Sequence, residues 1–301
     1  MAILSENMRG AILMTASMTA YTVNDAFFKA LSDELPLFQA IFFRGIAVVA
    51  CLTVAGIILG QLELRQSKRD WFFILARAVF ELGAAFLFLL ALINMPIANV
   101  TAILQALPLT VSLAAAVFLG ATIGWRRLAA IFIGFIGVLL IIKPGSDGFN
   151  VYALYALAAV GFVTARDILV PKISKEVPTM VVAWATAIVV MLGGGVMSLT
   201  ETWQPLSTLG QLQMAGAVLA ILGGSIFSIV AMRHGDIAFV APFRYSGLIA
   251  AVIVGFVFFS EFPDTLTIIG SLIVVGTGIF TLYRDNRIAK RTQIEADSAF
   301  N

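Results

Sequence analysis

The chain has 301 residues, of which 60% are hydrophobic and only 12% are charged, and its mean hydropathy is +1.01. Because soluble domains carry about 25% charged residues, this composition excludes an ordinary soluble domain and indicates an integral membrane protein. The net charge of +2 does not indicate nucleic-acid binding, and the single cysteine, Cys51, excludes both an intrachain disulfide and a cysteine metal site.

Apolar segments long enough to cross a bilayer account for nearly the whole chain. A helix needs about 20 apolar residues to span the hydrocarbon core. The pattern therefore predicts an all-α polytopic membrane protein with ten transmembrane helices and a polar tail over 284–301. The predicted spans are 9–31, 36–60, 71–93, 96–119, 126–143, 150–170, 178–199, 211–232, 236–259 and 264–283.

The basic residues outside these spans are distributed unequally between the two sides of the membrane. If the N-terminus is cytoplasmic, the cytoplasmic segments carry thirteen Lys and Arg residues, and the external segments carry only Lys29 and Lys143. Because positive charge concentrates on the cytoplasmic side, we expect both termini to be cytoplasmic.

Ionisable side chains also fall inside the predicted spans, where one charged group costs about 2.5–3.5 kcal/mol on insertion scales. Seven such groups facing lipid would together cost roughly 20 kcal/mol, more than a typical folding free energy. They must face a cavity, pair with one another or reach the membrane surface. The seven are Asp25, Arg44, Arg77, Glu81, Arg166, Asp167 and Arg244.

Several of these charges have a candidate partner nearby in the sequence. Two pairs are four residues apart and share a helical face: Asp25 with Lys29, and Arg77 with Glu81. The first two residues either reach the membrane surface and pair at the helix end, or form part of a site. The second two either form a structural salt bridge, or Glu81 faces a cavity, where it binds a substrate amine or titrates. The adjacent Arg166 and Asp167 are either an inner gate or an interfacial pair.

Arg44 and Arg244 have no acidic residue three or four positions away. Their partner must be a residue on another helix, or a ligand carboxylate or phosphate, both of which guanidinium groups bind well. We therefore consider both residues as substrate-binding or gating side chains, with an interhelical salt bridge as the alternative.

Prolines interrupt the fourth and ninth spans. Pro108 lies midway along the fourth span and Pro242 lies early in the ninth, and each removes a backbone donor. In lipid, the freed carbonyls are tolerated only beside protein or a water-filled cavity. Broken helices at corresponding positions of two halves point to a central site, which Gln105 and Tyr245 would supply with polar groups. Kinks that serve packing alone are the alternative.

The second half of the chain repeats features of the first. A shift of 142 residues places Asp25 on Asp167 and Pro36 on Pro178, and a shift of 140 places Ala98 on Ala238. Five spans per unit invert the second unit relative to the first. We therefore predict two inverted five-helix repeats, 9–143 and 150–283. Glycines in the fifth and tenth spans, including Gly137 and Gly270, predict a close packing seam.

Five short motifs stand out along the chain: Asn24 to Lys29, Phe43-Arg44, Ile97 to Val100 with Pro108-Leu109, Ala241 to Tyr245, and Ser260 to Asp264. Together they resemble the EamA type of the drug/metabolite transporter superfamily over residues 10–283. The second half looks closest to bacterial S-adenosylmethionine-uptake-like carriers. One departure is Ala121, which stands where the family carries a glutamate, whereas its counterpart Glu261 is retained.

The resemblance implies a carrier of the bacterial inner membrane that works by alternating access. Because the interior offers both acids and guanidinium groups, we expect a small polar or zwitterionic substrate, with an amino acid or a derivative favoured. Proton coupling through Glu81, Asp25 or Asp167 and facilitated diffusion both remain open, as do a monomer and a homodimer. We expect no cofactor, no metal and no nucleic-acid partner.

Other functions are less well supported by the sequence. Export of cationic drugs or vitamin-like metabolites is the first alternative, because members of the superfamily transport such compounds. An intramembrane enzyme is disfavoured because there is no zinc-binding His-Glu-x-x-His pair and no Gly-x-Ser-x-Gly elbow. A channel is disfavoured because the intramembrane charges are of mixed sign, whereas a charge-selective pore would show a ring of like charges.

Overall fold

The computed structural model describes residues 6–120, 124–146, 148–233 and 237–299, and these ranges contain helices and no strand. The predicted all-α fold is therefore confirmed. The helices are α1 (Glu6–Leu31), α2 (Leu37–Ile58), α3 (Lys68–Asn94), α4 (Ile97–Leu104), α5 (Leu107–Leu119), α6 (Trp125–Ile142), α7 (Tyr152–Leu169), α8 (Thr179–Ser198), α9 (Thr208–Arg233), α10 (Ile237–Val240), α11 (Ser246–Phe259) and α12 (Thr265–Ala299), with 3-10 turns η1 (Val170–Lys172) and η2 (Ala241–Tyr245).

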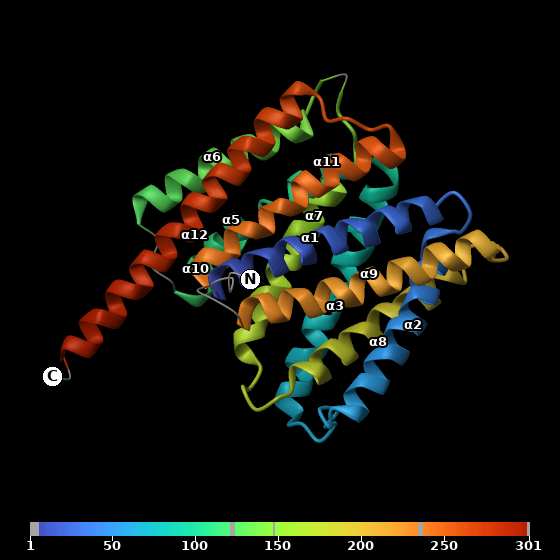
Figure 1. Ribbon diagram of the computed structural model, residues 1–301, viewed down its shortest axis with the longest axis horizontal. Coiled ribbons are helices and arrows are strands. Elements are labelled where there is room, and N and C mark those ends of the chain that lie inside the picture. Colours follow the sequence, from blue (N-terminus) through green and yellow to red (C-terminus); the bar gives the residue numbers. More distant parts are fainter. Residues whose placement is uncertain (1–5, 121–123, 147, 234–236, 300–301) are drawn as a thin grey trace, which may run out of the picture.

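Within the described ranges, nine helical stretches are long and apolar enough to cross a membrane. The first predicted span forms α1, which is 26 residues long but less apolar, because it carries several threonines as well as Asn24 and Asp25. The polar tail predicted over 284–301 is helical as far as Ala299, since α12 continues into it and projects beyond the bundle in Figure 1.

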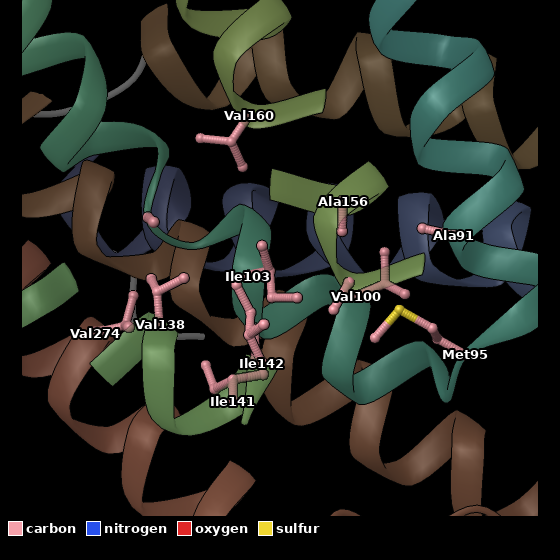
Figure 2. Packing of buried hydrophobic residues seen from close by; sticks show 13 residues of the cluster. Ala91, Met95, Val100, Ile103, Val138, Ile141, Ile142, Ala156, Val160 and Val274 are labelled. Atoms are coloured by element: carbon pink, nitrogen blue, oxygen red, sulfur yellow. The ribbon is translucent and has the colours of Figure 1, made fainter. Parts of the chain in front are cut away.

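Helices far apart in the sequence lie side by side. In Figure 1, α6 and α12 run together along one edge, α1 lies between α9 and α11, and α2 and α8 form the opposite edge. Helix α3 packs against both α7 and α8. A buried apolar cluster shown in Figure 2 joins α3, α4, α6, α7 and α12, and it includes Val100, Ile103, Val138, Val160 and Val274.

The α6–α12 contact follows from its glycines, as the sequence predicts. A Cβ atom on Gly270 would lie 2.5 Å from the carbonyl oxygen of Gly137, and a Cβ atom on Gly137 would lie 2.8 Å from the carbonyl oxygen of Gly270. Only glycine at both positions permits this approach of the two backbones. Small residues allow such contacts between membrane helices and so maximise van der Waals packing.

Both predicted helix breaks are present. The fourth span is divided into α4 and α5 by Gln105 and Ala106, and Pro108 occupies the first turn of α5. The ninth span is divided into α10 and α11 by the 3-10 turn η2, which contains Pro242. Proline is tolerated in the first turn of a helix, where its missing N–H group has no intrahelical acceptor, so each proline marks the start of a new segment.

Candidate functional site

One group of polar side chains lies where α1 faces α2, and we call Asn24, Asp25, Phe28 and Arg44 the α1–α2 cluster. Arg44 Nη1 donates to Asn24 Oδ1 at 3.4 Å, and its Cζ atom lies 4.7 Å from the centroid of the Phe28 ring. Asn24 Nδ2 donates to Asp25 Oδ1 at 2.9 Å. Within the described chain, neither Asp25 nor Arg44 forms an ion pair. A carboxylate and a guanidinium group therefore lie close together without neutralising each other directly.

A second group joins α3, α7 and α8. Arg166 forms ion pairs with Glu81 and with Asp167, the latter at 2.8 Å from Nη2. Arg77 Nη1 donates to Thr186 Oγ1 at 2.9 Å. The structure thus does not form the predicted pair between Arg77 and Glu81. Because α3 packs against both α7 and α8, Arg77 and Glu81 find partners on different helices. The α3–α7 cluster consists of Arg77, Glu81, Arg166, Asp167 and Thr186.

Lys29 likewise does not pair with Asp25. Its Nζ atom lies 2.5 Å from Glu261 Oε1 and donates to the Met95 carbonyl oxygen at 2.6 Å. Glu261 Oε2 accepts a hydrogen bond from the Ile97 N–H at 3.1 Å. This Lys29–Glu261 cluster connects α1, the link between α3 and α4, and the end of α11. The sequence alone indicated Glu261 only through its retention in the second repeat.

The broken helices bring Gln105 close to Gly247 at the start of α11: a Cβ atom on Gly247 would lie 3.9 Å from Gln105 Nε2. No hydrogen bond of the Gln105 side chain is found in the described part of the protein. Thr22, three residues before Asp25, lies 3.5 Å from the Gly247 carbonyl oxygen and donates to it. The start of α11, next to the break in the ninth span, therefore contacts α1 close to the α1–α2 cluster.

The remaining predicted residues lie elsewhere. Tyr245 is 6% exposed, and its hydroxyl is directed at Gly278 of α12 rather than at Gln105. That hydroxyl has no hydrogen-bond partner among the residues that the structure describes. Arg244 is exposed in η2, and in the described part of the chain no hydrogen bond or ion pair connects it to any of the three charged clusters. Pro108 and Pro242 are half-buried and act through the backbone.

Asn24, although it lies in one of the quoted motifs, and Thr186 were not among the candidate site residues of the sequence analysis. Asn24 bridges Asp25 and Arg44, and Thr186 binds Arg77. Thr186 follows Arg44 by 142 residues, the same shift that places Asp25 on Asp167. Shifting the position of every intramembrane charged residue by 142 would therefore have singled out Thr186.

An open groove of about 680 Å³ runs along the other side of α1. It contains no residue of the three clusters, and its lining is almost wholly apolar, so it does not suit a charged solute. The lining residues are Met8, Ala11, Ile12, Thr15, Ala16, Thr19, Ala20, Val23, Ala220 and Phe243.

Comparisons with known proteins agree with a membrane carrier. Residues 8–143 match the EamA-like transporter family. The chain is 29% identical over 281 residues to an S-adenosylmethionine uptake transporter of Rickettsia conorii, covering 91% of this chain and 92% of the relative. It is 27% identical over 273 residues to the pseudopaline exporter CntI of Pseudomonas aeruginosa, covering 88% and 93%.

More distant matches extend the comparison. A riboflavin transporter of Rhizobium johnstonii is 26% identical over 194 residues, which is 64% of each chain. One solved structure, described only as a crystal structure of a protein, superposes with a TM-score of 0.66 at 18% identity and covers 93% of this chain and 98% of its own. At that identity the superposition supports the fold alone.

Proposed function

Because the chain belongs to the EamA type of the drug/metabolite transporter superfamily, we propose that it transports a zwitterionic metabolite that binds at the α1–α2 cluster. As a member of this family it is a transporter and not an enzyme. The substrate class we favour is an amino acid or an amino-acid derivative.

The observation that carries this proposal is the arrangement of Asp25 and Arg44. The two opposite charges lie inside membrane helices, share Asn24 as a neighbour and make no ion pair with each other. A guanidinium group has five N–H donors, and among the described residues only one of these donors has a side-chain acceptor, at 3.4 Å. A substrate carboxylate would bind Arg44 and a substrate ammonium group would bind Asp25, so that each half-buried charge gains a partner.

The Rickettsia relatives support the same chemistry. S-adenosylmethionine, named for them, is a methionine derivative that carries a sulfonium charge as well as the α-ammonium and α-carboxylate groups of an amino acid. A purely cationic drug would satisfy Asp25 but would leave Arg44 beside another positive charge. The mixed sign of the cluster therefore favours a zwitterion over a cation.

We further propose that the protein is built from two inverted repeats and works by alternating access. The helix bounds support this organisation at the shift of 140 residues seen in the sequence. Helix α4 begins at Ile97 and α10 at Ile237, and α6 begins at Trp125 and α12 at Thr265. Helices α5 and α11 end at residues 119 and 259, each followed by a residue in the left-handed conformation.

The orientation and the coupling are also part of the proposal. With both termini cytoplasmic in the bacterial inner membrane, the end of α1 near Leu31 faces away from the cytoplasm, and we call it the outer end. Among the three carboxyl groups considered for proton coupling, Glu81 and Asp167 are engaged by Arg166. Asp25 forms no ion pair in the described part of the chain, so we assign proton or ammonium binding to Asp25.

Uptake into liposomes containing the purified protein tests the proposal. We expect labelled S-adenosylmethionine or methionine to enter with saturation and to show counterflow when the liposomes are preloaded with unlabelled compound. Transport of riboflavin or a cationic dye, with no transport of any compound that has both an amine and a carboxylate, would refute the zwitterion. Linear, non-saturating flux would refute a carrier.

A further inference from the structure

The Lys29–Glu261 cluster is built into the outer end of the bundle by the local backbone. Helix α11 ends at Phe259, and Ser260 adopts the left-handed conformation at a φ of 54°. The Glu261 N–H then turns back and donates to the Gly255 carbonyl oxygen at 2.9 Å. Such a cap satisfies helix-end carbonyls, and here it also fixes the backbone from which the Glu261 carboxylate projects.

Both oxygens of that carboxylate are used. One binds Lys29 and the other accepts from Ile97 N–H, one of the first donors of α4, which has no acceptor within its own helix. Lys29 adds a hydrogen bond to the Met95 carbonyl oxygen. The two side chains are only 11% and 22% exposed, so water screens the ion pair less than it screens a pair on the surface.

The position of the cluster relative to the proposed site suggests its role. Lys29 lies one helical turn, about 6 Å at 1.5 Å per residue, beyond Asp25 toward the outer end of α1. The cluster also joins α4 and α11, the helices that adjoin the two breaks. We propose that Lys29 and Glu261 form the outer gate, which must open before a solute from outside reaches the α1–α2 cluster. This inference rests on the proposed carrier function.

Only the second of the two proposed repeats carries the glutamate that forms this gate. The residue 140 positions before Glu261 is Ala121, which has no carboxylate and lies outside the described residues. The corresponding inner end therefore cannot close with the same ion pair. The α3–α7 cluster, in which Arg166 joins α7 to Glu81 of α3, supplies a cross-helix contact toward that end instead.

Accessibility of a single cysteine tests the gate without any substrate. The reporter is Ala98→Cys in a Cys51→Ser background, because Ala98 is 3% exposed and follows Ile97, the residue held by Glu261. Full-length protein in right-side-out membrane vesicles is treated with a membrane-impermeant maleimide. We expect slow labelling in the parent, and labelling about 10-fold faster after Glu261→Gln, since a 10-fold change corresponds to 1.4 kcal/mol in the opening equilibrium.

Two further variants make the result decisive. Lys29→Gln removes the same ion pair from the other side and should accelerate labelling equally, so a folding defect in one variant leaves the test intact. Asp264→Asn is the matched control, because it breaks another outer Lys–carboxylate pair, with Lys143, that links the ends of α6 and α12. It should leave the rate unchanged. Parental labelling rates in the folded gate variants, or equal acceleration by Asp264→Asn, would overturn the gate.

The same measurement separates the gate from the proposed function. Maleimide labelling requires no transported solute, so a protein that fails to carry zwitterions can still show the gate. Conversely, saturable zwitterion transport with unaltered labelling in the Glu261→Gln and Lys29→Gln variants would retain the carrier and reject the gate.

Discussion

The sharpest prediction concerns how Arg44 and Asp25 divide the binding of a zwitterion between them. A hydrogen bond to a charged group contributes about 1.5–3 kcal/mol. At 1.4 kcal/mol per factor of ten, losing one such contact weakens affinity by roughly 10- to 150-fold. Arg44 is half-buried, and its only side-chain hydrogen bond within the described ranges is the long one to Asn24. We therefore expect Arg44→Gln to lie in the upper part of that range.

Substrate analogues assign each charge to its partner. Binding of methionine and S-adenosylmethionine to the purified protein is measured by calorimetry and compared with analogues that lack the amine or carry an esterified carboxylate. Arg44→Gln should weaken binding of the parent compounds but not of the ester. Asp25→Asn should weaken binding of the parent compounds but not of the compound without an amine. Melting temperatures of both variants establish that they are folded.

A charge control and a clear contrary result complete this test. Arg9→Gln also removes one positive charge, but Arg9 is exposed at the start of α1 and pairs with Glu6, so its affinity should match the wild type. If Arg44→Gln weakens the ester as strongly as the free carboxylate, Arg44 does not bind the carboxylate. The assignment of the site would then be wrong.

Two predictions concern stability, each measured as the melting temperature of the detergent-purified protein. Gly270→Ala should lower the melting temperature clearly, because the new Cβ would lie 2.5 Å from a backbone oxygen of α6. The control Gly276→Ala, whose Cβ would have no heavy atom within 4 Å, should be neutral or slightly stabilising. Similar losses in both variants would argue against the α6–α12 seam. Glu81→Gln should also lower the melting temperature, by removing a partly buried ion pair with Arg166. That loss should be smaller in an Arg166→Gln background, where the pair is already absent. Equal losses in the two backgrounds would mean that the pair contributes nothing.

Local chemistry made several features predictable from the sequence alone. Membrane insertion follows from composition and segment length. The interruptions of the fourth and ninth spans follow from Pro108 and Pro242, because a proline removes a backbone donor wherever it stands. The close contact of α6 and α12 follows from glycines, which lack the Cβ atom that would hold two backbones apart.

The pairing of charges was decided only by the tertiary structure. Spacing along one helix offered Asp25 as a partner for Lys29, but Lys29 binds Glu261, 232 residues away. Glu81 likewise binds Arg166 on α7 instead of the nearby Arg77. Side chains four residues apart share a helical face, yet the helix packed against that face offers them competing partners. Which helix that is depends on the packing of the whole bundle, and this information is absent from any short stretch of sequence.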